Sequence, residues 1–218
     1  MSVKPKHAQM DSTSWTRKEL LILETLKTPY AIQQFLDSVE YSADAFYRCP
    51  RRVMADRKAH CSDGALFAAA ALRRLGYPPL IMELRAVRDD DHLLAVFRRH
   101  GGYGAIAKSN FVTLRYREPV YRSLRELVMS YFEVFYNVEA EKTMRAYSLT
   151  LNLSRFDALR WTIEDEGIET IMDALDRSRH YPVMNQAVLS ELQLVDPRSY
   201  EAGLIGSKAE GLYRPGEK

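Results

Sequence analysis

The segment from residue 60 to residue 79 constrains the fold more than any other part of the chain. Apolar residues recur there at helical spacing and predict a helix over residues 62–75 with one apolar stripe. That stripe consists of Ala65, Ala68, Leu72 and Leu75. Gly76 is a favourable helix end, and Pro78 and Pro79 prevent the helix from continuing. The helix therefore has a fixed length and one face to bury against another element.

Three strands are predicted to follow this helix. Runs of apolar residues with strand character cover residues 80–88, 92–98 and 103–110. The three aspartates 89–91 form a polar turn between the first two strands, and Gly101-Gly102 marks a hairpin loop between the second and third. Connections this short join antiparallel strands. The centre of the chain is thus a helix followed by an antiparallel meander sheet, which is an α+β fold.

Additional helices are predicted on both sides of this centre. Their ranges are 15–27 and 30–39 before it, and 123–136, 154–161, 165–178 and 186–194 after it. Residues 1–14 are polar and are expected to form a flexible arm, and residues 201–218 a flexible tail. We expect residues 15–200 to form a single domain with a helical C-terminal part.

Composition excludes several classes of protein. The chain has 218 residues, of which 46% are hydrophobic, so it can bury a sizeable core. Its longest apolar run, residues 65–72, is far shorter than the roughly 20 residues of a membrane-spanning helix, so no membrane contact is expected. Two cysteines do not make a disulfide scaffold, and the N-terminus lacks an apolar leader, so we expect a cytoplasmic protein.

Cys61 is the first candidate for chemistry, because it lies at the start of the predicted helix. The first N–H groups of a helix carry partial positive charge, which favours a thiolate. Cys61 is also in phase with the apolar stripe, so its side chain should point toward the sheet. A buried structural cysteine is the competing interpretation.

His92 is the second candidate and begins the second predicted strand. In that place it can lie across from the N-terminus of a helix that packs on the same sheet. A nucleophilic cysteine needs a neighbouring base, and the base needs a third group to orient it. A solvated histidine beside three aspartates is the alternative.

These residues together resemble the transglutaminase-like superfamily, which has the papain-like cysteine protease fold. The resemblance lies in His60-Cys61-Ser62-Asp63-Gly64-Ala65, in Leu72-Arg73-Arg74-Leu75-Gly76-Tyr77-Pro78, and in Asp91-His92 after a strand. It covers about residues 45–135. It implies a catalytic cysteine at a helix start, a catalytic histidine at the start of the second strand, and a third residue on the third strand. It implies neither a cofactor nor a metal.

The sequence departs from the family pattern at the third residue, where an aspartate is usual. The predicted third strand ends in Lys108-Ser109-Asn110, without an acid. Asn110 is the first choice for the third residue, since an amide carbonyl can accept from an imidazole N–H, and Ser109 is the second.

The resemblance implies thiol-dependent acyl transfer or hydrolysis on an amide or peptide carbonyl, with Cys61, His92 and Asn110 as the catalytic residues. The enzyme would be a cysteine peptidase, an amidase or a transglutaminase-like acyltransferase. The alternative is a catalytically inactive papain-like scaffold that serves as a binding module, because fold does not fix function.

Two other classes stay open at this point. A zinc site would draw on His60, Cys61, Asp63, Asp89, Asp90, Asp91, His92 and His100, although the spacing of zinc motifs is missing. Nucleic-acid binding would draw on the basic run of Arg48, Arg51, Arg52, Arg57 and Lys58. A net charge of only +2 makes nucleic acid an unfavoured partner.

Overall fold

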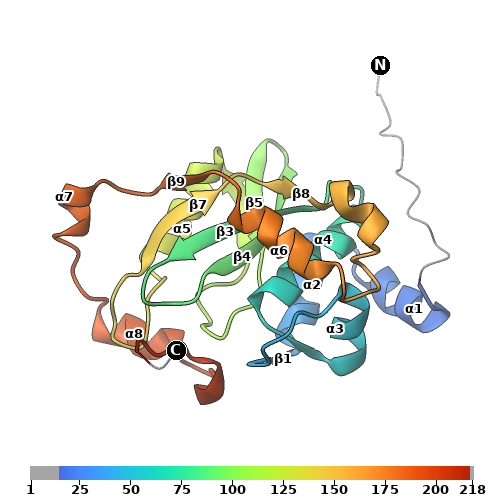
Figure 1. Cartoon of the computed structure of the whole chain (residues 1–218), viewed down its shortest axis with the longest axis horizontal. Helices are drawn as coiled ribbons and strands as arrows, with labels where there is room; N and C mark the ends of the chain where they lie inside the picture. The colour runs from blue at the N-terminus through green and yellow to red at the C-terminus, as the bar shows by residue number, and fades with distance from the viewer. Residues whose placement is uncertain (1–14, 217–218) are drawn as a thin grey trace.

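A computed structural model describes residues 15–216 of the chain (Figure 1). The helices are α1 (Arg17–Thr25), α2 (Pro29–Asp37), α3 (Pro50–Asp56), α4 (Cys61–Arg74), α5 (Leu124–Phe132), α6 (Ile168–Asp176), α7 (Gln186–Leu189) and α8 (Pro197–Gly203), with the 3₁₀ helices η2 (Leu153–Leu159) and η3 (Ala209–Gly211). The strands are β1 (Glu40–Tyr41), β2 (Lys58–Ala59), β3 (Leu80–Ala86), β4 (His92–Arg99), β5 (Gly102–Ile106), β6 (Arg117–Tyr121), β7 (Met144–Ser148), β8 (Leu151–Asn152) and β9 (His180–Pro182).

The main sheet has seven strands, and all of its pairings are antiparallel. Its order is β6-β5-β4-β3-β7-β9, with β8 paired to β3. Strands β3, β4 and β5 form the predicted meander directly after α4, and further helices precede and follow it. The predicted α+β class, with a helix followed by an antiparallel sheet and additional helices at both ends, is therefore confirmed.

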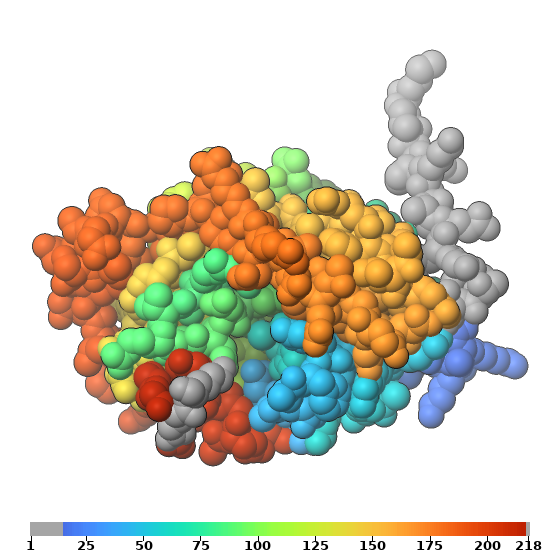
Figure 2. Space-filling model, in the orientation of Figure 1, coloured from blue at the N-terminus to red at the C-terminus, as the bar shows by residue number. Residues whose placement is uncertain are grey.

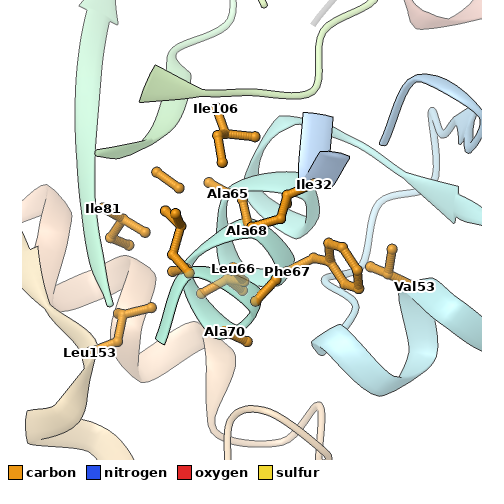
Figure 3. Close-up of a cluster of buried hydrophobic side chains, with 14 of the residues drawn as sticks. Ile32, Val53, Ala65, Leu66, Phe67, Ala68, Ala70, Ile81, Ile106 and Leu153 are labelled. Atoms are coloured by element: carbon orange, nitrogen blue, oxygen red, sulfur yellow. The ribbon is translucent and has the colours of Figure 1, made fainter. Parts of the chain in front are cut away.

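Helix α4 packs on one face of this sheet, as its stripe predicted. Every residue from 65 to 72 is at most 2% exposed, and the helix shares a core with Leu93, Ala95 and Phe97 of β4. Figure 3 shows alanines of α4 beside Ile106 of β5. Small side chains on α4 let the helix approach the sheet closely, so its N-terminus lies directly against the strands.

Helix α5 belongs to the core on the other face. There Leu94 and Val96 of β4 pack with Tyr131 of α5 and with Phe135 beyond it. Successive side chains of a strand point to opposite faces. Odd-numbered residues of β4 therefore face α4, and even-numbered residues, beginning with His92, share the face of α5.

The third strand of the meander is shorter than predicted. Strand β5 ends at Ile106, where Lys108 leaves the sheet and donates through its ammonium group to the carbonyls of Leu36 and Val39. Those carbonyls lie at the C-terminal end of α2, where a cation is favoured. Asn110, which was predicted on the strand, consequently lies in the loop after it.

The C-terminal third is less helical than predicted. Strands β7 and β9 stand where no strand was expected, and the predicted helix over residues 154–161 is the 3₁₀ helix η2. The predicted helix over 186–194 is only the single turn α7. The predicted arm, residues 1–14, lies outside the described residues. Within residues 15–216, no helix is both long and apolar enough to cross a membrane.

Candidate functional site

A cavity of about 760 Å³ opens where the N-terminus of α4 meets β4. Its lining includes Cys61 and His92 as well as Ser109 and Asn110. All of the residues predicted for the site therefore contribute to the lining of one space, which we call the site cavity. The contacts of each residue decide what this space can do.

Cys61 is the first residue of α4 and is partly buried. Its sulfur lies 3.6 Å from the carbonyl oxygen of Asp91 and 3.9 Å from the Ser62 hydroxyl. Burial raises the pKa of the Cys61 thiol to about 11, although the Leu93 N–H and the Ser62 hydroxyl act in the opposite direction. The thiol is thus protonated near neutral pH, and it donates a hydrogen bond to the Asp91 carbonyl.

His92 is buried, and its ring lies between two aromatic side chains of the α5 face. The ring centroids of Tyr131 and Phe135 are 6.4 Å and 6.2 Å from that of His92, both edge-on. The His92 Nε2 lies 2.9 Å from the carbonyl oxygen of Leu114. Burial lowers the pKa of His92 to about 4, so the imidazole is neutral at physiological pH.

The Leu114 contact fixes the tautomer of His92. A carbonyl oxygen can only accept a hydrogen bond, so Nε2 must carry the proton and Nδ1 must hold a lone pair. Leu114 thereby orients the imidazole, which is the task that the sequence had given to Asn110 or Ser109. A main-chain carbonyl leaves no signature in a sequence, so this hydrogen-bond partner of His92 could not be predicted from residue types.

Asn110 and Ser109 have other partners. The Asn110 amide donates to the Lys208 carbonyl at 2.8 Å and accepts from the Lys208 N–H at 2.8 Å. The Ser109 hydroxyl accepts from the N–H of Phe111 at 3.0 Å. Within residues 15–216, no hydrogen bond joins Cys61 to His92, or His92 to Ser109 or Asn110. These residues therefore line one cavity, with His92 on the α5 face of the sheet and Cys61 at the start of α4, and the described hydrogen bonds do not link them to each other.

His60 has a role that the sequence did not indicate, because it caps α4. Its Nδ1 accepts from the N–H of Ser62 at 3.1 Å and from that of Asp63 at 3.5 Å. In return, the Asp63 carboxylate accepts from the His60 N–H at 3.2 Å. The cap therefore engages the N–H groups of Ser62 and Asp63, the two helix residues that follow Cys61.

Burial of the two site histidines predicts a pH-dependent stability. The pKa values of His60 and His92 are both lowered to about 4 by burial, whereas an unfolded histidine titrates near 6.5. The unfolded state therefore binds more protons in this window, so this stabilisation is complete above pH 6.5 and is lost as the pH falls toward 4. The slope is up to about 1.4 kcal/mol per pH unit for each histidine.

Urea unfolding of the parent protein and of His92→Gln from pH 8 to pH 5 tests this prediction. The stability difference between the two proteins should shrink as the pH falls, because glutamine does not titrate. Comparing the two proteins removes the opposite contribution of Asp89, whose pKa is raised to about 6 by burial. A constant difference across this range would show that His92 is not held neutral.

The structure also bears on zinc and nucleic acid. Among residues 15–216, no three His, Cys, Asp or Glu side chains are grouped in a way that could hold a metal ion. Four residues of the basic run form ion pairs: Arg48 with Asp44, Asp56 and Asp63; Arg51 with Glu19; Arg52 with Asp56 and Asp165; and Lys58 with Glu40. The fifth, Arg57, donates to the carbonyl and the hydroxyl of Ser38. These contacts give the run a structural role.

Comparison with known proteins gives a distant likeness to solved structures. No family model matches the chain, and no curated protein matches it. Two solved structures of LapG from Legionella pneumophila, one of them EGTA-treated, are similar to it. The TM-scores are 0.40 (EGTA-treated) and 0.41, with sequence identities of 15% and 14%. Each match covers 70% of this chain and 93% of LapG. The likeness is a distant one of fold, and no residue role is taken from it.

Proposed function

We propose that this protein catalyses thiol-dependent acyl transfer or hydrolysis on an amide or peptide carbonyl, with Cys61 as nucleophile and His92 as base. The observation that carries the proposal is the hydrogen bond from His92 Nε2 to the Leu114 carbonyl. It leaves Nδ1 with a lone pair in a histidine that lines the same cavity as the thiol. Leu114 takes the orienting role that the family pattern gives to a side chain.

The reaction starts from a neutral thiol and a neutral imidazole. His92 Nδ1 takes the thiol proton, directly or through one water, while the sulfur bonds to the carbonyl carbon of the substrate. The Cys61 N–H, at the positive end of α4, faces the charge that develops on the carbonyl oxygen. The C–N bond then breaks, the proton passes from Nδ1 to the leaving amine, and a thioester remains on Cys61. Water or a second amine attacks this thioester and releases the acyl group.

The acyl-enzyme is the species that tests this mechanism. We expect an acetylated peptide p-nitrophenyl ester to acylate Cys61. Intact-protein mass spectrometry should then show a mass increase of one acyl group. His92→Gln should slow acylation by about 100-fold or more, because positioned proton transfer contributes about 10²–10⁴-fold. Cys61→Ala should abolish the adduct.

Two variants serve as matched controls. Cys49→Ala removes the other thiol, which is 2% exposed and has its pKa raised to about 12 by burial. His100→Asn changes an exposed histidine at the hairpin turn and keeps a residue that tolerates its positive φ. Both should acylate at the parent rate. Acylation that is unaffected by His92→Gln contradicts the assignment of the base.

A binding function is the second candidate, and two observations favour it. The pKa of the Cys61 thiol is raised, and within the described residues no hydrogen bond joins Cys61 to His92. Both features are those of a site in which the thiol is not activated as a nucleophile. A protein that bound a peptide without cleaving it would keep the same cavity. Absence of any Cys61 adduct, together with measurable ligand binding, would select this alternative.

A further inference from the structure

The C-terminal segment of residues 207–214, here called the strap, lies across the site cavity. Glu210, Gly211, Leu212, Tyr213 and Arg214 belong to its lining. Figure 2 shows the C-terminal residues, in red, beside the green segment that holds β3 and β4. The cavity is therefore formed in part by a piece of main chain from the far end of the sequence.

The strap is held through its backbone. The Asn110 amide both donates to the carbonyl and accepts from the N–H of Lys208, each at 2.8 Å. This two-point contact engages only the main chain of Lys208, which is extended just before the 3₁₀ helix η3, so it does not depend on the Lys208 side chain. Asn110 is only 8% exposed, so its amide is held in place by its surroundings. Its contact with Lys208 is a partly buried one.

The strap also passes unusually close to the residues beside the thiol. A Cβ atom added at Gly211 would lie 2.7 Å from the Tyr41 ring and 3.0 Å from the Asn110 side-chain nitrogen. Tyr41 lines the cavity, and its pKa is raised by burial and then by the neighbouring Cys61. The strap thus packs tightly against Tyr41 and Asn110, which line the cavity together with Cys61, and a side chain at position 211 would force one of them to move.

Charge indicates what the cavity binds. Its lining outside the strap carries the carboxylates of Asp44, Glu83, Asp89, Asp90, Asp91, Asp173 and Asp176. Four of these carboxylates have a basic partner: Asp44 pairs with Arg48, Glu83 with Arg85 and His180, Asp173 with Arg177, and Asp176 with Arg85. Asp89 and Asp91 instead accept from uncharged groups, the Thr143 hydroxyl and the Ala86 N–H. The strap brings Arg214 to this lining, and Lys208 forms an ion pair with Glu40.

From the backbone clamp, the close passage and the charge, we infer that the site cavity binds a positively charged peptide segment, and that the strap, which includes the 3₁₀ turn η3, is its intramolecular occupant. The strap and a peptide ligand would then compete for Asn110. The inference adds a ligand class to the proposed function but does not depend on the reactivity of Cys61.

Fluorescence anisotropy with two labelled peptides tests the inference. The first probe has the sequence of residues 205–216, and the second carries glutamate in place of the residues corresponding to Lys208 and Arg214. The protein is the full-length chain with Cys61→Ser, which cannot form an acyl-enzyme. Adding Gly211→Leu should displace the strap and tighten binding of the first probe at least tenfold. The second probe should bind at least tenfold more weakly than the first.

Lys208→Glu is a second route to the same state, since it places two negative charges together at Glu40 without adding bulk near Tyr41. It should also tighten binding of the first probe, and thermal unfolding shows whether each variant is folded. Equal affinities in the parent and in both folded variants, or equal binding of both probes, would overturn the inference. Because binding is measured without the thiol, a failure here is distinct from a failure to form the Cys61 adduct.

Discussion

Asp63→Ala is expected to lower the free energy of unfolding by about 3–5 kcal/mol, measured by urea denaturation. Asp63 is fully buried and accepts from the N–H groups of Arg48, at 2.7 Å, and His60. The Arg48 guanidinium, only 3% exposed, lies 3.7 Å from the carboxylate. Removing Asp63 leaves the N–H groups of Arg48 and His60 without their acceptor and takes the one fully buried carboxylate away from the Arg48 guanidinium, and unsatisfied buried donors are costly.

Asp56→Ala is the matched control, because Asp56 pairs with the same arginine at 3.0 Å but is 34% exposed. Water can replace a carboxylate there, so the loss should be about 1 kcal/mol or less. Equal losses in the two variants would contradict the view that Asp63 holds the start of α4. Asp63→Asn should lie between them, since an amide keeps one acceptor oxygen.

Gly64→Ala is expected to destabilise the protein by about 3 kcal/mol, at the upper end of the usual range for overpacking. The added Cβ would lie 2.3 Å from the Cβ of Lys108 and 3.4 Å from its Cα. Helix α4 would have to move away from the loop after β5, and Cys61 would move with it. Thermal or urea unfolding measures the loss.

The sign of this effect is itself informative. In a helix without a close neighbour, alanine is more stable than glycine by about 1 kcal/mol. A stabilising Gly64→Ala would therefore refute the close approach. Lys108→Gly removes the clashing Cβ, so the double variant should lose less than the sum of the single losses, as coupled positions do.

The elements that the sequence predicted best are those with strong local signals. Helix α4 was expected over residues 62–75 and spans Cys61–Arg74, because its stripe ends at a glycine before two prolines. Strands β3 and β4 also stand where the apolar pattern placed them. Burial of long apolar runs can be inferred without knowing their partners.

Other features depend on partners that are distant in the sequence. The end of β5 follows from the reach of Lys108 to α2, 72 residues away in the chain. Strand β7 carries three half-buried side chains and no clear alternation, so its pattern was not distinctive. The role of His60 as the N-cap of α4 was not predicted, because Ser, Thr, Asp and Asn are the usual N-caps and histidine is not.

The candidate site was predictable only where its residues carry local sequence signals. The position of Cys61 at a helix start and of His92 at a strand start is local information, and the structure has both. The partner of the imidazole is a backbone carbonyl, and Asn110 faces a segment almost 100 residues later. No reading of residue types near the meander could have found either contact.

The two outer strands of the main sheet affect how copies of this protein behave at high concentration. β6 and β9 are the edges, and they contain Pro119 and Pro182. Proline lacks the N–H that a further strand would need, and the charged Arg117 and Glu118 next to Pro119 add to this protection. Edge-to-edge aggregation of the sheet is therefore disfavoured.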